Sequence, residues 1–210
     1  MPIADIYDVI RQRRSIRRYQ PKPVPKETVR EVLEAATCAP SAHNSQPWRF
    51  IILEDTKVKW DLAEQMAEAW ATDLAKGNQT VDAKTRSDRV ERFANAPVLI
   101  LANLTMDGLR KFPDEPRQRI ERDLAVESLG AGIQNLLLAA HASGLGACWY
   151  CAPAFCKGLV QEILKIPKSV EPHAFIILGY PAECPPGPPK KKHTDYCFVN
   201  FWGTHELSDP

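Results

Sequence analysis

Pro-Ser-Ala-His-Asn-Ser-Gln-Pro-Trp, residues 40–48, is the stretch on which the organisation of this chain depends. It directly follows an apolar-periodic segment and precedes an isoleucine-rich run, so it predicts a turn between a helix and a strand. Such a turn exposes hydroxyl and amide side chains together with backbone N–H groups. These groups can hold a polar aromatic ligand through neutral hydrogen bonds.

Upstream, Arg-Arg-Ser-Ile-Arg-Arg-Tyr at residues 13–19 adds positive charge and hydroxyl groups. Guanidinium and hydroxyl groups suit a phosphate and a sugar-like chain. Taken singly, an arginine-rich helix end is usually a solvated face, and a Ser/Asn/Pro cluster is usually a loop. Taken together, the two stretches predict a site for a phosphorylated heteroaromatic cofactor.

The elements around these stretches follow from hydrophobic periodicity. Four apolar runs predict buried strands at residues 48–53, 98–104, 147–151 and 173–179. Helical spacing predicts helices at residues 3–14, 25–36, 56–76, 119–141 and 159–164. We expect Thr56 to cap the third helix, residues 77–95 to form a mobile connection or cover, and residues 106–117 to form a loop. Strands separated by helices are typical of an α+β or α/β fold.

Two segments in the second half have unusual composition. The helix at residues 119–141 contains Gly130 and Gly132, which predict close approach to the core or to a second subunit. The proline-rich residues 181–189 exclude regular structure and lead into Lys190, Lys191 and Lys192. Beyond them the tail is strongly aromatic, so we expect it to pack on something, a partner chain being one choice.

Length and charge limit the function classes. A chain of 210 residues can build one good core, so we expect a single domain over residues 1–210. Its formal net charge of +1 gives no electrostatic case for binding nucleic acid or an acidic membrane surface. No signal peptide is recognised, and no apolar run approaches the roughly 20 residues that span a bilayer. We therefore expect a soluble, cytoplasmic protein.

The six cysteines raise a metal hypothesis. Cys148, Cys151 and Cys156 have a spacing in which thiolates can hold zinc or an iron–sulfur cluster. These residues lie among aromatic neighbours, however, and no second CxxC or histidine pair completes four ligands. Reduced packing thiols and no metal site are the expectation.

Four motifs in order carry a family resemblance. They are the two stretches above, Gly-Leu-Gly-Ala-Cys-Trp at 144–149 and Val-Asn-Phe-Trp-Gly at 199–203. With these motifs the chain resembles the FMN-dependent nitroreductase family over nearly its whole length. The resemblance implies an α+β fold with a mixed, mainly antiparallel sheet flanked by helices. It also implies an intertwined homodimer whose C-terminal segments extend onto the partner, with two FMN molecules in the interface.

The resemblance implies roles for particular residues. Arg13, Arg14 and Ser15 match ligands of the flavin phosphate and ribityl chain, and Arg17 matches the cation beside N1 and the C2 carbonyl. The isoalloxazine contacts from the other subunit match Pro40, Ser41, Ala42 and Asn44, and Gln46 would support this loop or touch the ribityl chain. The segment running past the ring, with a backbone N–H toward N5, matches Cys148, Trp149, Tyr150 and Cys151.

Two departures from the family pattern accompany these assignments. Tyr150 and Cys151 stand where glycines are common in the family, which leaves the shape of the substrate pocket open. The C-terminal basic pair that meets the phosphate is represented by Lys190 to Lys192, with Lys190 and Lys192 as its candidates. Lysine supplies charge without the bidentate fork of arginine, and a solvated basic turn is an alternative for each lysine.

The family mechanism needs no side-chain nucleophile, and no catalytic side chain is assigned. NAD(P)H reduces the flavin at N5 and leaves, and an acceptor such as a nitroaromatic, quinone or enone takes its place. His43 lies in the cofactor loop, but a lone loop histidine is more often a surface residue. Two alternatives stay open. The chain also resembles the flavin domain of deazaflavin-coenzyme biosynthesis, which reduces a precursor of that coenzyme, and the same ligands could hold flavin in a binding module with little turnover.

Overall fold

The computed structural model describes residues 5–204 and is built on one four-stranded sheet. The strand order is β1-β2-β4-β3, and every neighbouring pair is antiparallel. The strands are β1 (Trp48–Leu53), β2 (Val98–Thr105), β4 (Val170–Gly179) and β3 (Gly146–Tyr150). All four strands were predicted, and the α+β fold with an antiparallel sheet is confirmed.

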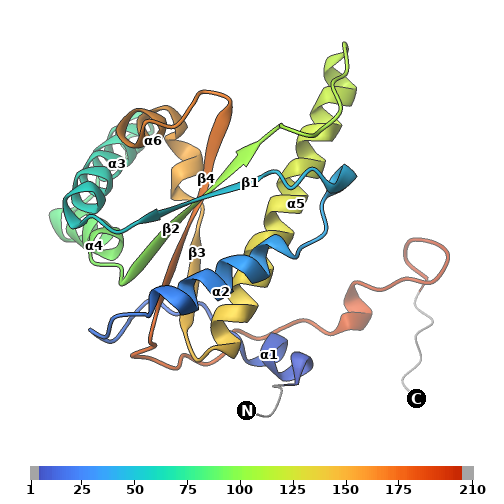
Figure 1. The fold of residues 1–210 in the computed structure, drawn as a ribbon, viewed down its shortest axis with the longest axis horizontal. Coiled ribbons are helices and arrows are strands. Elements are labelled where there is room, and N and C mark those ends of the chain that lie inside the picture. The colour runs from blue at the N-terminus through green and yellow to red at the C-terminus, as the bar shows by residue number, and fades with distance from the viewer. Residues whose placement is uncertain (1–4, 205–210) are drawn as a thin grey trace.

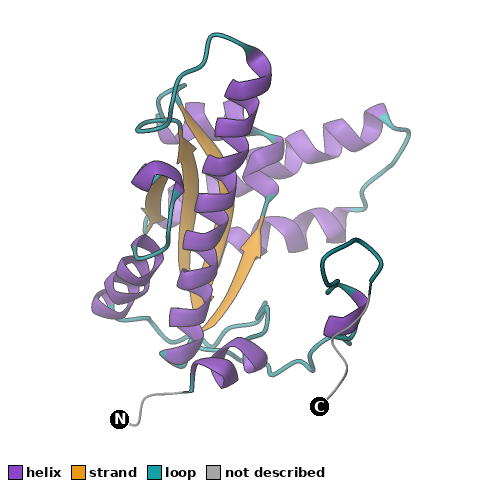
Figure 2. Ribbon diagram, turned by 90° about the vertical axis from the view of Figure 1, so that its right-hand side faces the viewer, coloured by secondary structure: helices purple, strands orange, loops and turns teal. Residues whose placement is uncertain are grey.

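Helices cover both faces of this sheet (Figures 1 and 2). One face packs against α2 (Lys26–Thr37) and α5 (Glu115–Ala142), and the other against α3 (Thr56–Lys76), α4 (Ala83–Ala94) and α6 (Lys157–Leu164). The short helix α1 (Ile6–Gln12) also contacts α5. Three single turns, η1 (Ala42–Asn44), η2 (Ala152–Phe155) and η3 (His193–Asp195), complete the elements.

The central strands are buried on both faces, because alternate side chains point into separate cores. In β2, Ile100 and Leu104 face α2 and α5, whereas Leu99 and Leu101 face α3, α4 and α6. In β4 the same alternation places Phe175 in the second core. The continuous apolar runs in the sequence therefore reflect strands in the middle of a three-layer structure.

The helix boundaries correct two predictions. Residues 83–94 form α4 rather than a mobile connection, because Val90 and Phe93 fill the second core while the remaining positions are largely polar. The cap of α3 is Asp55 and not Thr56, since the Asp55 carboxylate accepts hydrogen bonds from the N–H groups of Lys57 and Val58. In the first predicted helix, Ile3 lies outside the described residues.

Glycines allow several close approaches that position the site. A Cβ at Gly132 would lie 3.3 Å from the carbonyl oxygen of Ala36, so the close approach predicted for this helix is made to α2 in the core. A Cβ at Gly146 would lie 2.7 Å from the Cβ of Ile16, and one at Gly179 would lie 2.8 Å from the Tyr19 ring. Residues 13–19 can therefore dock on the sheet only where these two strands lack side chains.

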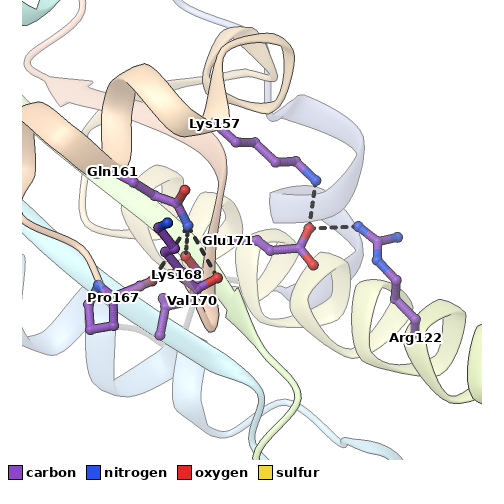
Figure 3. Close-up of polar contacts among 7 residues, drawn as sticks. All are labelled: Arg122, Lys157, Gln161, Pro167, Lys168, Val170 and Glu171. Carbon is purple, nitrogen blue, oxygen red and sulfur yellow. Dashed lines mark hydrogen bonds and ion pairs between the residues drawn. The ribbon is translucent and has the colours of Figure 1, made fainter.

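A partly buried ion-pair cluster fastens the first half of α5 to the sheet and to α6 (Figure 3). Glu171 Oε2 of β4 accepts hydrogen bonds from Arg122 Nη2 at 2.8 Å and from Lys157 Nζ at 2.6 Å. Burial by itself would raise the pKa of Glu171, but these two cations outweigh burial and hold the pKa below its ordinary value. This cluster keeps α5 in place beneath the turn at residues 41–46.

Large apolar side chains remain exposed at both ends of the described chain. In α1, Ile6, Tyr7 and Ile10 are each more than half exposed, at 57%, 65% and 51%. The tail after β4 extends away from the body in Figure 1, and Trp202 is 91% exposed. The predicted packing partner of the tail is thus not supplied by the described residues of this chain. Among those residues, no helix is both long and apolar enough to cross a membrane.

Candidate functional site

The arginine-rich stretch leaves α1 and lies along the free edge of β3. The Ile16 N–H donates to the carbonyl of Ala147 at 2.9 Å, so Ser15 forms a parallel bridge with β3. Glu183 Oε1 accepts hydrogen bonds from the backbone N–H of Arg17 at 2.7 Å and of Arg18 at 3.2 Å. These bonds fix the backbone of residues 15–18 and leave its cationic side chains for other partners.

A cleft of about 660 Å³ opens beside this segment, and we call it the basic cleft. Its polar lining consists of Arg11, Arg13, Arg14, Ser15, Arg17, Gln134 and Lys190. No carboxylate is among the described residues that line it. The structure therefore brings Lys190 together with Arg13, Arg14 and Ser15, predicted for the phosphate and ribityl chain, and with Arg17, predicted for the N1 and C2 carbonyl edge. Lys192 is not in the lining.

The arginines of the basic cleft affect the pKa of a neighbouring histidine. His141, near the C-terminus of α5, lines a smaller cavity with Arg13 and Arg14. Burial, followed by the charges of Arg13 and Arg14, lowers the pKa of His141. Arg14 is held by its own backbone, because Nη1 donates to the carbonyls of Arg11 at 2.6 Å and Arg13 at 2.8 Å. The cleft is thus a preorganised cationic surface of the kind that binds phosphate.

The predicted ring-contacting segment, Cys148 to Cys151, is the end of β3. Cys148 and Tyr150 point into the second core or toward its rim, and Trp149 packs on the α5 side. Backbone groups of alternate residues point the same way along a strand, so the Trp149 N–H faces the same open edge as the Ala147 carbonyl. The Trp149 indole N–H is buried without a hydrogen-bond partner among the described residues.

A second cavity, of about 490 Å³, lies between α3, α4 and the end of β3, and we call it the aromatic cavity. Trp70, Arg89, Arg92, Phe93, Tyr150 and Cys151 are among its lining residues. Trp70 enters this space from α3. A third cavity of about 440 Å³ shares Arg17 with the basic cleft and Arg92 with the aromatic cavity. The three spaces therefore adjoin one another through Arg17 and Arg92.

The turn at residues 41–46 has an unusual backbone. Three of its non-glycine residues adopt positive φ angles: His43 at 55°, Asn44 at 51° and Gln46 at 47°. Each such residue costs of order 1 kcal/mol, and these conformations persist only where the surroundings enforce them. Here Ser41 Oγ accepts from the Gln46 N–H at 3.0 Å. The turn is thus held in one shape that leaves Asn44 and Gln46 exposed.

The turn rests on the first half of α5. The Ala42 N–H donates to Ser128 Oγ at 3.1 Å, and His43 Nε2 lies 3.4 Å from Glu121 Oε1. Glu121 is buried and also accepts from the Arg110 N–H at 3.1 Å. His43 is exposed, as expected of a loop histidine, but it has a local partner in Glu121 that helps to anchor the turn.

Within one chain the two predicted halves of the site are separate. Ser128 precedes Gln134 of the basic cleft by about 9 Å along α5, and precedes His141 by about 20 Å, at about 1.5 Å per residue. None of the turn residues lines the basic cleft or the aromatic cavity. The turn residues predicted to touch the cofactor are Pro40, Ser41, Ala42, Asn44 and Gln46, and Pro40 is also exposed.

The sequence matches one protein family over most of its length. The model of the Nitroreductase family matches residues 10–180. A protein of Methanothermobacter thermautotrophicus, provisionally named NADH dehydrogenase/NAD(P)H nitroreductase, is 33% identical over 209 residues, covering 98% of this chain and 84% of its own. The chain belongs to the nitroreductase family.

Solved structures agree with this membership. A protein of Desulfovibrio desulfuricans, provisionally named a nitroreductase and determined in complex with FMN, is 27% identical, with a TM-score of 0.71. The alignment covers 93% of this chain and 97% of that chain. A BluB-like flavoprotein of Clostridium difficile, 23% identical over 93% of this chain and 98% of its own, has a TM-score of 0.77 and shares the fold.

In this member of the nitroreductase family, the residues of the basic cleft suit the phosphate end of FMN. The basic cleft is lined by guanidinium, hydroxyl and ammonium groups and by no carboxylate of the described residues. Such groups suit a phosphate and a ribityl chain. All six cysteines are free, and within residues 5–204 no group of three or more His, Cys, Asp or Glu side chains could hold a metal ion. The cationic and hydroxyl lining of the basic cleft has the chemistry that binds an organic phosphate.

Several residues around the site were missed in the sequence. Glu183 holds the arginine stretch, Gln134 enters the basic cleft, and Arg89 and Arg92 line the aromatic cavity. Arg89 and Arg92 are three residues apart, and with Val90 and Phe93 they have helical spacing that could have been recognised. Glu183 carried no such signal, because its contact joins residues 166 positions apart.

Proposed function

We propose that this nitroreductase-family enzyme is an FMN-dependent oxidoreductase that passes hydride from NADH or NADPH to a conjugated electrophile. Family membership and the NAD(P)H nitroreductase relative support a flavin oxidoreductase. The observation that carries the proposal is a carboxylate-free basic cleft joined to an aromatic cavity by a third cavity, which shares Arg17 with the first and Arg92 with the second. FMN with its phosphate in the basic cleft would place its ring beside Arg17 and the end of β3, at the rim of the aromatic cavity, and the cavity itself would stay open for the second substrate.

The residues that line these spaces then have distinct roles. Arg13, Arg14 and Lys190 hold the phosphate, and Ser15 contacts the phosphate or ribityl chain. The side chain of Arg17 lines both the basic cleft and the next cavity, so it places a fixed cation between the phosphate end and the ring. A cation in that position favours the negative charge that reduction adds to the ring.

FMN held by these residues would supply the hydride-transfer chemistry. The protein orients the ring and supplies hydrogen bonds and charge. The outward-facing N–H of Trp149 is the backbone donor available along β3, and Cys148, Tyr150 and Cys151 set the wall beside it. The acceptor classes are nitroaromatics, quinones and enones, each of which has a conjugated system that can take a hydride.

The enzyme works as a homodimer in this proposal. The exposed turn at residues 41–46 has its amides outward, and the half-exposed α1 and the aromatic tail lack cover in one chain. A second copy that buries α1 and the tail would bring its turn to the flavin ring, with Asn44 donating and accepting hydrogen bonds at the ring edge. Each site would then take its phosphate ligands from one subunit and its Asn44 from the other.

An absorption spectrum, followed anaerobically after adding NADH or NADPH, tests the enzyme function. The purified protein supplied with FMN should show flavin bands that bleach, and a nitroaromatic or quinone should restore them. Tight FMN binding without bleaching by either nicotinamide over hours would favour a flavin-binding module. Failure to bind FMN at all would overturn the proposal.

Mixed dimers test the shared site. Arg14→Gln removes a phosphate ligand, and Asn44→Gly removes the amide while tolerating the positive φ. When the two variants are combined in one dimer, a shared site leaves one site intact and one doubly altered. At FMN concentrations below the Kd of either variant, about one FMN per mixed dimer is therefore expected. Sites built within single chains would all carry one change, and no FMN binding would be restored.

A further inference from the structure

Two arginines of α4 face the aromatic cavity without an anionic partner. Arg89 Cζ lies 4.3 Å from the centre of the Trp70 ring, and Arg92 Cζ lies 5.6 Å from the centre of the Tyr150 ring. Neither guanidinium forms an ion pair or a hydrogen bond with another described residue; their contacts are with these aromatic rings. Arg86, one turn earlier on the same helix, is instead 3.4 Å from the carboxylate of Glu68.

The wall of the cavity carries an unbalanced positive charge. Asp73 is the one carboxylate among its lining residues, and this group is already paired with Lys76 at 2.7 Å and is largely exposed. Burial, followed by the neighbouring charge of Arg92, lowers the pKa of Arg89. A partly buried guanidinium with a second, exposed cation beside it is an unfavourable arrangement that an anion between Arg89 and Arg92 would relieve.

The remaining wall suits a flat conjugated molecule. Phe93 and Tyr150 meet edge to face with ring centres 5.4 Å apart, and Trp70 stands on the opposite helix α3. A volume of about 490 Å³ holds an acceptor of one or two rings. Tyr150 and Cys151 belong both to this wall and to the segment expected beside the flavin, so a molecule here would lie next to the redox centre.

From this arrangement we infer that the acceptor is an anionic conjugated electrophile, whose carboxylate, sulfonate or phosphate group is bound by Arg89 and Arg92. The inference rests on the proposed function, because it assigns a substrate class to the same site. The contacts with the Trp70 and Tyr150 rings use no N–H donor of Arg89 or Arg92 in a hydrogen bond, so these donors remain available for the anion. A planar fork of this kind recognises an oxyanion with defined geometry.

Binding and turnover of a matched pair of ligands test the inference. The FMN-loaded protein is titrated with 4-nitrobenzoate and with its neutral methyl ester, and the shift of the flavin absorption bands gives each Kd. Steady-state reduction of both compounds is measured in parallel. The acid should bind about tenfold or more tightly than the ester, as charge-assisted hydrogen bonds to arginine predict.

Three variants test whether Arg89 and Arg92 cause the preference for the acid over the ester. Arg89→Gln and Arg92→Gln should each weaken binding of the acid about tenfold and leave binding of the ester unchanged. Arg86→Gln is the matched control, because Arg86 lies on the same helix outside the cavity and should leave both Kd values unchanged. Circular dichroism and thermal unfolding establish that α4 is intact in every variant.

The outcomes separate the inference from the function beneath it. Equal binding of acid and ester, with normal flavin bleaching by NADH or NADPH, would overturn the inference and leave the oxidoreductase intact. Failure of bleaching would remove the proposed function itself. If the arginine variants slow only bleaching, the two cations serve the phosphates of the nicotinamide donor. If the variants instead dissociate the dimer, measured by size-exclusion chromatography, the cations pair with the second subunit. Either result overturns the assignment to the acceptor.

Discussion

The arginine stretch at residues 13–19 and the turn at residues 41–46 are both polar segments at helix ends, yet they differ in how the chain completes them. The arginine stretch docks along β3 through the Ile16 to Ala147 hydrogen bond and lines a cleft with Lys190 of the same chain. The turn is supported from below by Ser128 and Glu121, while its exposed amides bond only to each other, Gln46 Nε2 donating to Asn44 Oδ1 at 3.4 Å.

One chain therefore supplies the predicted phosphate ligands together, but it supplies only one part of the surface that would bind the ring. A cationic cleft needs several side chains from one rigid surface, which the edge of β3 provides. The turn instead stores backbone strain at three positive φ angles to present its side chains outward. Such strain is typical of a surface shaped for a partner or ligand.

The largest effect should come from undocking the arginine stretch. In Gly146→Ala the new Cβ would meet Ile16 at 2.7 Å, so the stretch must move away from β3. Overpacking of this kind costs about 1–3 kcal/mol of unfolding free energy, and FMN affinity should fall about 100-fold or more. Urea unfolding and FMN fluorescence titration measure the two effects.

The control for this change is Gly158→Ala, because nothing lies within 4 Å of a Cβ at that position of α6. It should leave stability and FMN binding almost unchanged. Wild-type FMN affinity in Gly146→Ala would show that docking of the arginine stretch on β3 is not needed for the site.

The next largest effect is a loss of FMN affinity that riboflavin, which has no phosphate, does not share. Arg14→Gln should weaken FMN binding about 10- to 100-fold, the value of a hydrogen bond to a charged group. It should leave riboflavin binding unchanged, because riboflavin lacks the phosphate. Arg18→Gln is the control, since Arg18 is exposed and does not line the basic cleft. Equal losses for FMN and riboflavin in Arg14→Gln would remove Arg14 from the phosphate site.

A smaller loss of affinity, shared by FMN and riboflavin, is expected from a change in the turn at residues 41–46. Asn44→Gly should weaken FMN and riboflavin binding equally, about 5- to 10-fold, because a neutral hydrogen bond contributes about 1 kcal/mol and Asn44 is assigned to the ring. Asn78→Gly is the matched control, because Asn78 also has positive φ, at 56°, and follows α3. Flavin fluorescence quenching measures all four affinities. A loss confined to FMN would place Asn44 at the phosphate instead.

The smallest effect on flavin binding is expected from the ion-pair cluster beneath the turn. Glu171→Gln should lower the unfolding free energy by about 1 kcal/mol at neutral pH and leave FMN affinity unchanged. The pKa of Glu171 is lower in the folded state, so its contribution is present above the ordinary value of 4.5 and is lost as pH falls through the folded pKa.

Unfolding free energies of the wild type and Glu171→Gln should therefore converge below pH 4.5. Urea unfolding at a series of pH values measures the convergence. A difference that stays constant through the acid range would mean that the Glu171 charge does not stabilise this part of α5.

Much of the fold was predictable because its helices and strands carry strong periodic signals. Val29, Val32 and Ala36 marked the buried face of α2, and the apolar runs marked all four strands. The helix α4 was missed because its sequence is mostly polar and its buried face consists of Val90, Phe93 and Ala94. Its helical order depends on packing against α3, which the sequence does not display.

The site was predictable only in part. Arg13, Arg14, Ser15 and Arg17 were assigned by motif and lie together with Lys190, a residue more than 170 positions later in the chain. Arg89 and Arg92 were not recognised, because a polar helix with two arginines usually has a solvated face. Their importance depends on where α4 crosses the end of β3.

The sequence by itself determined the family, the antiparallel sheet between helices and the two polar stretches, because these depend on local periodicity and on residue types in order. Tertiary structure alone decided that Gly146 and Gly179 admit the arginine stretch, that Glu183 fixes it, and that Arg89 and Arg92 lack a carboxylate. Contacts between distant residues depend on the packing of whole elements in space, and no local pattern in the chain records them.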